Sequence, residues 1–252
     1  MMWNVDFSGK TALVVGGSRG IGASACRMLA DAGAAVAVAD ILAADDLCAE
    51  IRAAGGQAIS VTGDITDPAR VDALFSRVET ELGAPELLAV TAGITSRYSF
   101  TDLTLAEWHR VMEVNLTGSF LVVQRAVPAM LRAGKGSIVL VGSQVSIVGG
   151  GGGAHYASSK AGLEGLVHHL SRELLPKGIR VNAVLPSTID TDLFRERYPD
   201  PAERAAVAAQ IPAQRLGTPE DGANAIVFLL SDRASYVCGH SLLVDGGRTY
   251  YR

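Results

Sequence analysis

The sequence predicts an α/β fold, a doubly wound parallel sheet of about seven strands with helices on both faces. Three observations carry this prediction. Short apolar runs of strand length alternate with segments of helical period along the whole chain. Most of the apolar runs are continuous, as in strands that are covered on both faces. No Pro/Ser-rich linker, charge block or internal repeat interrupts the alternation, and strand–helix–strand repetition favours a parallel sheet.

The expected elements can be placed from these patterns. Strands are expected at 11–15, 35–39, 58–62, 87–91, 137–142, 180–185 and 241–244. Helices are expected at 21–32, 44–54, 69–82, 105–131, 157–177 and 219–230.

The domain organisation follows from the same rhythm. We expect residues 1–252 to form one domain. Residues 186–217 form a long irregular stretch, with only a short helix expected near 202–209, and such segments serve as lids or binding loops. This stretch is therefore the predicted substrate lid. Five glycines in a row, 149–153, predict either room for a bulky substrate and a mobile entrance, or a plain flexible connection.

Composition excludes several classes of function. The formal net charge is -4 and no stretch collects Lys and Arg, which argues against a nucleic-acid partner. The sequence contains no run of about 18 apolar residues, so it predicts no membrane-spanning helix. The N-terminus lacks the apolar core of a signal peptide. Three cysteines stand at spacings that suit no metal site. We expect a cytoplasmic protein without a metal ion.

A glycine-rich turn joins the first strand to the first helix. Gly16, Gly20 and Gly22 allow a tight turn, and the helix that begins near Ile21 offers free N–H groups and its positive dipole end to an anion. Ser18 and Arg19 lie inside the turn. The pattern predicts a Rossmann-like pyrophosphate site, although the glycines alone would also suit a simple strand–helix turn.

Asp40 follows the second strand, about twenty residues beyond the turn. There a carboxylate can accept hydrogen bonds from the adenosine ribose hydroxyls; the alternative is a helix N-cap. Asp40 would face the 2′-phosphate of NADP, and like charges about 4 Å apart cost several kcal/mol at a partly buried site. Arg19 argues for NADP, because a guanidinium could bind that phosphate. We expect NAD as cofactor in preference to NADP.

Tyr156 and Lys160 are four residues apart, so they share one face of a helix. Ser143 lies thirteen residues before Tyr156, at the end of a strand. Hydride transfer to a ketone leaves an alkoxide that needs a proton, which a tyrosine can supply. The pKa of a tyrosine is near 10, and a nearby ammonium together with a nicotinamide cation would lower it. Ser143 would polarise the carbonyl.

These residues resemble the short-chain dehydrogenase/reductase family over nearly the full length, from Gly9 to Gly247. The matching pieces are Gly16-x-x-x-Gly20-Ile21-Gly22, Asp40, Asp64-Ile65, Ala92-Gly93, Asn115, Ser143, Tyr156-x-x-x-Lys160 and Val244-Asp245-Gly246-Gly247.

The resemblance implies a role for each matching residue. Asn115 would hold a water that links Lys160 to solvent, and Lys160 would also bind the nicotinamide ribose. Contacts to the cofactor are implied at Ser18, Arg19, Asp64, Ile65, Ala92, Gly93, Pro186, Ile189 and Thr191. Two alternatives stay open: Asn115 as a polar helix residue satisfied by backbone, and Asp64 as the cap of the following turn.

The chain departs from the family pattern at three places. Val15 stands where the family usually has Thr, Val90 and Thr91 where it has two Asn, and Ser187 where it often has Gly. We expect Thr91 to replace part of the lost bonding between strands.

The predicted function is that of an NAD(P)-dependent oxidoreductase interconverting a secondary alcohol and a ketone, with Tyr156 as general acid/base. An inactive dinucleotide-binding regulatory or scaffold protein of the same fold is the alternative, since fold alone does not imply chemistry. A sugar-nucleotide epimerase is disfavoured, because the chain ends soon after the last strand.

The expected partners are a small-molecule alcohol or ketone and further copies of the chain, with no nucleic acid or membrane. The substrate would be selected by 95–100, 144–155 and 187–212, with Leu193, Phe194 and Tyr198 as an apolar lid. Arg195 and Arg197 could belong to this surface or face solvent. The apolar helices at 105–131 and 157–177, with the resemblance, predict a homodimer through a four-helix bundle or a homotetramer through the last strand.

Overall fold

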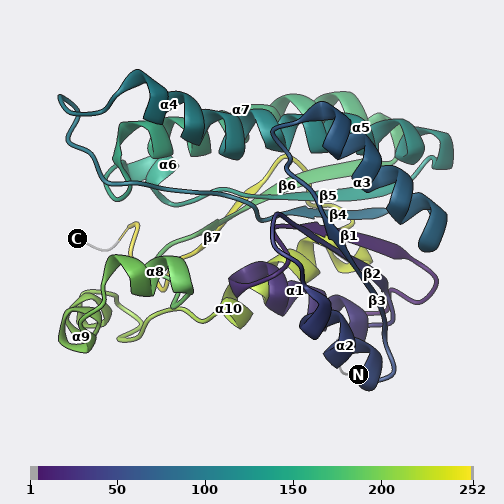
Figure 1. Cartoon of the computed structure of the whole chain (residues 1–252), viewed down its shortest axis with the longest axis horizontal. Coiled ribbons are helices and arrows are strands. Elements are labelled where there is room, and N and C mark those ends of the chain that lie inside the picture. The colour runs from purple at the N-terminus through teal and green to yellow at the C-terminus, as the bar shows by residue number, and fades with distance from the viewer. Residues whose placement is uncertain (1–4, 251–252) are drawn as a thin grey trace.

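A computed structural model gives the fold of residues 5–250 (Figure 1). Residues 1–4 and 251–252 lie outside the described residues. The predictions for the extreme N-terminus and for the two ends of the expected domain fall on them. Seven parallel strands form one sheet in the order β3-β2-β1-β4-β5-β6-β7. The predicted α/β class is therefore confirmed.

The strands lie where the apolar runs placed them, and no strand end is shifted by more than one residue. They are β1 (Thr11–Val15), β2 (Ala35–Asp40), β3 (Gln57–Thr62), β4 (Leu87–Val90), β5 (Gly136–Val141), β6 (Ile179–Pro186) and β7 (Ser241–Val244). Every residue of β1, β4 and β6 is buried, because helices cover both faces.

Two layers of helices enclose the sheet (Figure 1). One layer contains α1 (Gly20–Asp31), α2 (Asp45–Ala53) and α10 (Pro219–Leu230), whose apolar residues pack together in one core cluster. The other contains α3 (Pro68–Glu81), α5 (Gly118–Ala133) and α7 (Gly153–Leu174), which form the second cluster. Local signals start two of these helices: Asp67 caps α3, and Thr218 with Asp221 forms a capping box on α10.

The prediction of one continuous α-helix at 105–131 is wrong, because a π-helical turn interrupts the α-helix. The structure has α4 (Leu105–Met112), a π-helical turn η1 (Glu113–Thr117) and then α5. A π turn adds a residue to the helix without ending it, so hydrophobic periodicity runs through it unbroken. Asn115 lies in this turn.

Three further helices of the described chain lie at the cleft side of the sheet. A short helix, α6 (Val145–Val148), follows β5, and α7 begins four residues before the expected start of 157. The predicted lid contains two helices, α8 (Asp192–Arg197) and α9 (Pro201–Ala209), of which only the second was expected. Figure 1 shows both projecting below the sheet at one end of the molecule. Between residues 5 and 250, no helix is both long and apolar enough to cross a membrane.

Candidate active site

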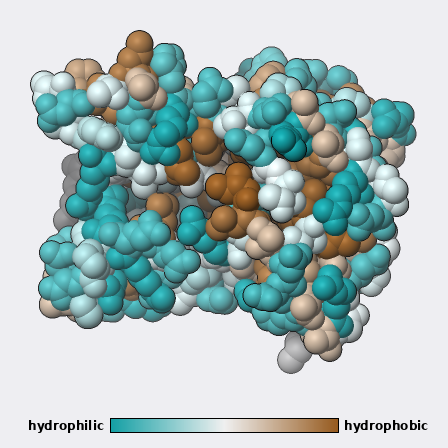
Figure 2. Space-filling view, viewed as in Figure 1, coloured by the Kyte–Doolittle hydropathy of each residue, from teal (hydrophilic) through white to brown (hydrophobic). Residues whose placement is uncertain are grey.

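A cavity of about 920 Å³ opens at the carboxyl ends of the strands. Its walls come from the ends of β1, β2, β4, β5 and β6, from α7 and from the lid. Figure 2 shows the molecule hollowed between the part that carries α4 and α6 and the part that carries α8 and α9. The hollow lies where the strand order reverses, between β1 and β4, which is where open α/β sheets bind ligands.

The turn between β1 and α1 requires glycine at two positions. Gly16 has a φ of +82°, and a β-carbon there would lie 2.4 Å from the Ala92 nitrogen. A β-carbon on Gly22 would lie 2.2 Å from the Gly16 carbonyl oxygen. The glycines are therefore required by close approach of backbone.

The N-terminus of α1 fits an anion. Arg19 occupies the N-cap without a side-chain hydrogen bond to the helix, and the first turn holds no acidic residue. Gly20, Ile21 and Gly22 line the cavity there. Free N–H groups and the positive end of the helix dipole are what a dinucleotide pyrophosphate needs.

Asp40 is the last residue of β2 and lines the same cavity. Its Oδ2 accepts hydrogen bonds from the Ser18 hydroxyl at 2.7 Å and the Ser18 nitrogen at 3.1 Å. Helix α2 has Ala44 at its N-cap, so the alternative interpretation of Asp40 as a helix cap is wrong. Ser18, predicted as a cofactor contact, supports Asp40 and does not itself line the cavity.

The residues implied at the adenine end also line the cavity. Asp64 Oδ1 accepts hydrogen bonds from the Thr66 nitrogen at 2.9 Å and hydroxyl at 2.8 Å. It therefore caps the following turn, as the alternative interpretation had it, and still faces the cavity beside the buried Ile65. Ile41 and Leu42, two exposed apolar residues after Asp40, complete this end; no sequence pattern distinguished them from an ordinary loop.

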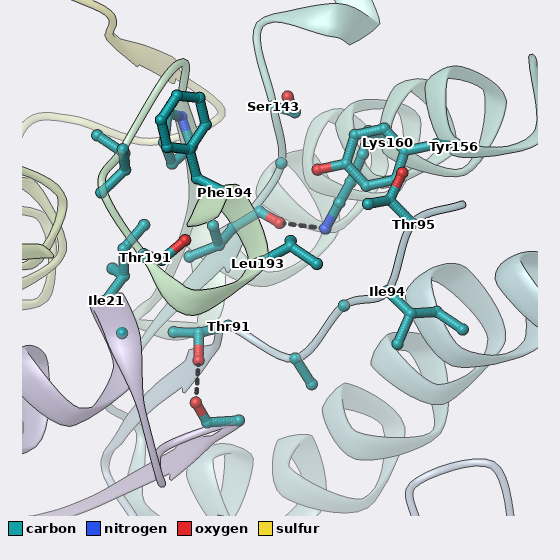
Figure 3. A pocket seen from close by; sticks show the side chains of 18 of the residues that line it. Ile21, Thr91, Ile94, Thr95, Ser143, Tyr156, Lys160, Thr191, Leu193 and Phe194 are labelled. Atoms are coloured by element: carbon teal, nitrogen blue, oxygen red, sulfur yellow. Dashed lines mark hydrogen bonds between the residues drawn. The ribbon is translucent and has the colours of Figure 1, made fainter. Parts of the chain in front are cut away.

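Thr91 ties β4 to the glycine turn, as expected for the substituted position. Its hydroxyl lies 3.0 Å from the Val15 carbonyl oxygen and 2.8 Å from that of Gly16 (Figure 3). Ala92 and Gly93 follow and line the cavity. A β-carbon on Gly93 would lie 3.1 Å from Lys160 Nζ, so the chain passes close to the lysine.

Three more predicted cofactor residues lie at the start of the lid. Pro186 ends β6, and Ile189 forms a β-bridge with Gly217. Thr191, the N-cap of α8, reaches the glycine turn: its Cγ2 would lie 3.2 Å from a β-carbon on Gly20. All three line the cavity.

Ser143, Tyr156 and Lys160 converge on one wall of the cavity. In Figure 3 the phenol oxygen of Tyr156 points into the space between Ser143 and the end of Lys160. Lys160 is 3% exposed and its Nζ donates to the Val141 carbonyl oxygen at 2.8 Å. Nζ lies 5.8 Å from the centre of the Tyr156 ring. Within residues 5–250 the lysine has no carboxylate partner, so its other protons are available to a ligand.

Burial has the largest effect on the pKa values of both Tyr156 and Lys160. Burial raises the pKa of Tyr156, while the nearby Ser143 hydroxyl and the charge of Arg197 act to lower it. Burial also lowers the pKa of Lys160 to about 8. The lowering of the Tyr156 pKa expected from Lys160 together with a nicotinamide cation stays a prediction.

Asn115 is fully buried behind this wall and does not line the cavity. Its Oδ1 accepts from the Ile94 nitrogen at 2.8 Å, and its Nδ2 donates to the Ile94 carbonyl oxygen and the Ser159 hydroxyl, each at 3.0 Å. The side chain thus joins the loop after β4 to α7. The backbone of Ile94 satisfies most of the side chain, in agreement with the alternative interpretation. Ser159 is a further partner that sequence reasoning missed.

His155, the neighbour of Tyr156, is fully buried and does not line the cavity. Its Nε2 lies 2.7 Å from the Ser96 hydroxyl, and burial lowers its pKa. It therefore anchors the loop after β4 and does not contact a ligand.

The five glycines have defined conformations. Gly149, Gly150, Gly152 and Gly153 have φ between +69° and +104°, where other residues are strained. A β-carbon on Gly152 would lie 2.6 Å from the Thr95 hydroxyl and 2.8 Å from the Tyr156 ring. The run therefore lets the chain turn closely against the tyrosine.

The chain resembles known oxidoreductases over almost its whole length. Residues 15–249 match the family model described as enoyl-(acyl carrier protein) reductase. The 3-oxoacyl-[acyl-carrier-protein] reductase of Escherichia coli is 38% identical over 96% of this chain and 98% of its own. The cis-4-hydroxycyclohexanecarboxylate dehydrogenase of Sinomonas cyclohexanicum is 41% identical over the same shares.

A solved structure extends the likeness to three dimensions. The gluconate 5-dehydrogenase of Burkholderia cenocepacia, crystallised with NADP and tartrate, superposes with a TM-score of 0.92 at 30% identity, covering 99% of this chain and 98% of that one. With the anion-binding turn and the Ser143, Tyr156 and Lys160 wall, these matches show that the chain belongs to the short-chain dehydrogenase/reductase family and is an NAD(P)-dependent alcohol/ketone oxidoreductase.

Proposed function

We propose that the protein interconverts a secondary alcohol and a ketone at the wall formed by Ser143, Tyr156 and Lys160. The observation that carries this proposal is the position of the Tyr156 phenol, which faces the same cavity as the free N-terminus of α1. A nicotinamide dinucleotide held by that turn would supply the hydride acceptor or donor. The relatives named above are oxidoreductases, so they do not favour the inactive alternative.

Each side chain has one task in the proposed reaction. Ser143 donates a hydrogen bond to the substrate oxygen and stabilises the charge that develops there. Tyr156 takes the hydroxyl proton during oxidation and returns it during reduction. Lys160 binds the nicotinamide ribose and holds a positive charge below the phenol. Asn115 positions the Ile94 loop and α7 and supports the proton path from Lys160 to solvent.

The test of this proposal is a survey of secondary alcohols with NAD and of ketones with NADH, read at the nicotinamide absorbance. Hydride transfer that depends on Tyr156 is the expected result. Binding of the dinucleotide without turnover on any member of a broad panel would contradict it and favour the inactive alternative.

We further propose NAD as the preferred cofactor. Asp40 is held by Ser18 at the end of β2, where a 2′-phosphate would meet a fixed carboxylate. Arg19 is exposed and makes no side-chain hydrogen bond to cap its helix, so it is the group that could oppose this preference. The related gluconate 5-dehydrogenase was crystallised with NADP, which makes a direct measurement necessary.

Replacing Asp40→Asn is expected to shift the ratio of kcat/KM for NADP to kcat/KM for NAD by about 100-fold towards NADP. Two like charges about 4 Å apart repel by about 4 kcal/mol at a partly exposed site. Movement of the phosphate away from the carboxylate reduces this repulsion, so the expected change is smaller than the full value. The amide oxygen can still accept from Ser18. Asp46→Asn, an exposed acid on α2, is the control and should leave the ratio unchanged. A wild-type enzyme that already prefers NADP would overturn the proposal.

Residues 186–217 are proposed as the substrate lid. Leu193 and Phe194 line the cavity opposite Tyr156 (Figure 3). The ring of Phe194 packs on that of Tyr198, with ring centres 4.9 Å apart. A single sheet with strands from both ends of the chain supports the proposal that residues 1–252 act as one domain.

The assembly is proposed to be a homodimer or homotetramer. Leu105, Phe120 and Leu131 are 69%, 42% and 38% exposed on α4 and α5, and β7 leaves one edge of the sheet open. Sedimentation equilibrium at micromolar concentration should give twice or four times the monomer mass. A monomer mass throughout would exclude both arrangements.

A further inference from the structure

One arginine of the lid faces the active-site cavity. Arg197 ends α8 and lines the cavity with Leu193 and Phe194 of the same helix. Its guanidinium lies across from the glycine run: Nη1 and Nη2 would be 3.4 and 3.5 Å from a β-carbon on Gly151. The guanidinium therefore lies within van der Waals reach of position 151, on the far side of the cavity from α8.

Arg197 differs from the other lid arginines in having no acceptor. Arg195 is paired with Asp190 at 2.9 Å, Arg215 with Asp221 at 2.5 Å, and Arg204 donates to the Tyr198 and Pro199 carbonyl oxygens. Within residues 5–250 Arg197 makes no hydrogen bond or ion pair, and its buried Nε has no partner. A buried donor without an acceptor is unfavourable, so this site is prepared for a ligand.

Tyr198 restrains the unpaired guanidinium. The centre of its ring lies 5.4 Å from Arg197 Cζ and 5.3 Å from that of Arg97, which reaches it from the loop after β4. Contact with the aromatic ring limits the motion of the arginine. Arg197 is thus held near the cavity wall without an acceptor.

The charge around Arg197 favours an anion close to the reacting group. Arg197 is near enough to lower the pKa of the Tyr156 phenol, and Lys160 adds a second positive charge on that wall. Three acidic residues of the described chain line the cavity. Asp40 and Asp64 lie at β2 and after β3, several strands away from β5 and β6. Asp192 begins α8, where its charge acts on Arg195, and it forms no ion pair with Arg197. Arg110 is neutralised by Glu107 and Arg248 donates to Thr188.

We propose that Arg197 is a specificity-determining residue that binds a carboxylate of the substrate, so that the enzyme acts on hydroxy acids and the corresponding keto acids. This inference rests on the proposed alcohol/ketone function. A planar guanidinium binds the two oxygens of a carboxylate with two parallel hydrogen bonds. Among the described residues that line the lid end of the cavity, Arg197 supplies the one unpaired guanidinium. A single guanidinium matches a singly charged anion better than a phosphate dianion. The carbinol of the same molecule would lie between Ser143 and Tyr156.

The experiment compares hydroxy acids with their uncharged primary amides, which have nearly the same shape. The probes are 3-hydroxybutanoate, 4-hydroxypentanoate and 4-hydroxycyclohexanecarboxylate, each with its carboxamide, because the number of bonds between carbinol and carboxylate is not fixed by Arg197 alone. We expect kcat/KM for the best acid to exceed that for its amide by about 100-fold, mainly through KM. Cyclohexanecarboxylate, which has no carbinol, should inhibit competitively against the alcohol.

Variants assign the preference to Arg197. Arg197→Met should bring the ratio of kcat/KM for the acid to kcat/KM for its amide close to 1, while Arg197→Lys keeps part of the preference. Loss of the arginine charge near Tyr156 lowers both rates together and leaves this ratio unaffected. Arg195→Gln removes a positive charge from the exposed side of the same helix and should change neither value. KM for NAD should be the same in all variants, which separates this role from a contact to the cofactor phosphates.

Two outcomes would overturn the inference. If wild-type enzyme oxidises each amide or uncharged alcohol as well as the paired acid, Arg197 does not select a carboxylate, although the proposed function stands. If an acid preference persists in Arg197→Met, another group binds the carboxylate. Absence of hydride transfer with acids, amides and simple alcohols alike would instead refute the proposed function, on which the inference rests. Because the wild-type comparison needs no variant, misfolding of one variant leaves the test intact.

Discussion

Tyr156→Phe is expected to lower kcat by about 10³-fold while NADH still binds. The substitution removes only the hydroxyl, and positioned proton transfer contributes about 10² to 10⁴-fold to such reactions. The ring keeps its contacts with Gly152 and Lys160, so the cavity wall should remain in place. Steady-state turnover with an alcohol, together with a fluorescence titration of NADH, measures both quantities.

The pH profile separates proton transfer from packing. Because burial raises the pKa of Tyr156, the phenolate that oxidation needs is scarce at neutral pH, and kcat/KM for oxidation should rise with pH. The residual rate of the phenylalanine variant should lack this dependence on Tyr156. Tyr236→Phe, which changes a fully exposed phenol outside the cavity lining, is the control. Near-normal turnover in Tyr156→Phe would refute the acid/base assignment.

Lys160→Met is expected to abolish most of the activity and to stabilise the protein by about 2 kcal/mol at neutral pH. Burial lowers the pKa of Lys160 from 10.5 to about 8, which corresponds to about 3 kcal/mol of cost for the charged form. Removal of the buried charge therefore stabilises the variant by about 3 kcal/mol. Loss of the hydrogen bond to the Val141 carbonyl oxygen destabilises it by about 1 kcal/mol. For a chain of this size the melting temperature should rise by about 5 °C.

The pH dependence of that difference follows from the direction of the shift. Below pH 8 the lysine is charged in both states, so the folded protein carries the full cost. Between pH 8 and 10.5 the unfolded chain binds more protons, so wild-type stability rises and the advantage of the variant shrinks. Thermal unfolding at pH 6.5 and pH 10 tests this, with the exposed Lys177→Met as control. A variant less stable than wild type at pH 6.5 would contradict the account.

Much of the fold, and the positions of the residues of the proposed catalytic wall, could be predicted from the sequence. Continuous apolar runs predict buried parallel strands, and a residue at the end of such a strand opens onto the cleft, which placed Asp40 and Ser143. The four-residue spacing of Tyr156 and Lys160 puts both on one face of α7. These predictions succeed because they depend on local periodicity and on the geometry of a parallel sheet.

Other features depend on contacts between distant segments and could not be predicted in this way. The π turn at Asn115 has no periodicity of its own, and the Asn115 partners lie on two other elements. Arg195 and Arg197 are indistinguishable in the sequence, yet one is paired and exposed and the other faces the cavity. The balance between burial and charge at Tyr156 also follows only from the packed structure.

The two walls of the cavity differ in how well they tolerate substitution. The wall formed by the glycine run beside Tyr156 tolerates little, and the wall formed by the lid tolerates more. Four of the five glycines have backbone conformations that side chains disfavour, and one of these lies against the catalytic ring. We therefore expect new substrate specificities to evolve through substitutions in α8 and α9, while the glycines at 149–153 are retained. An engineer who wishes to redirect the enzyme would randomise the lid and leave the glycines alone.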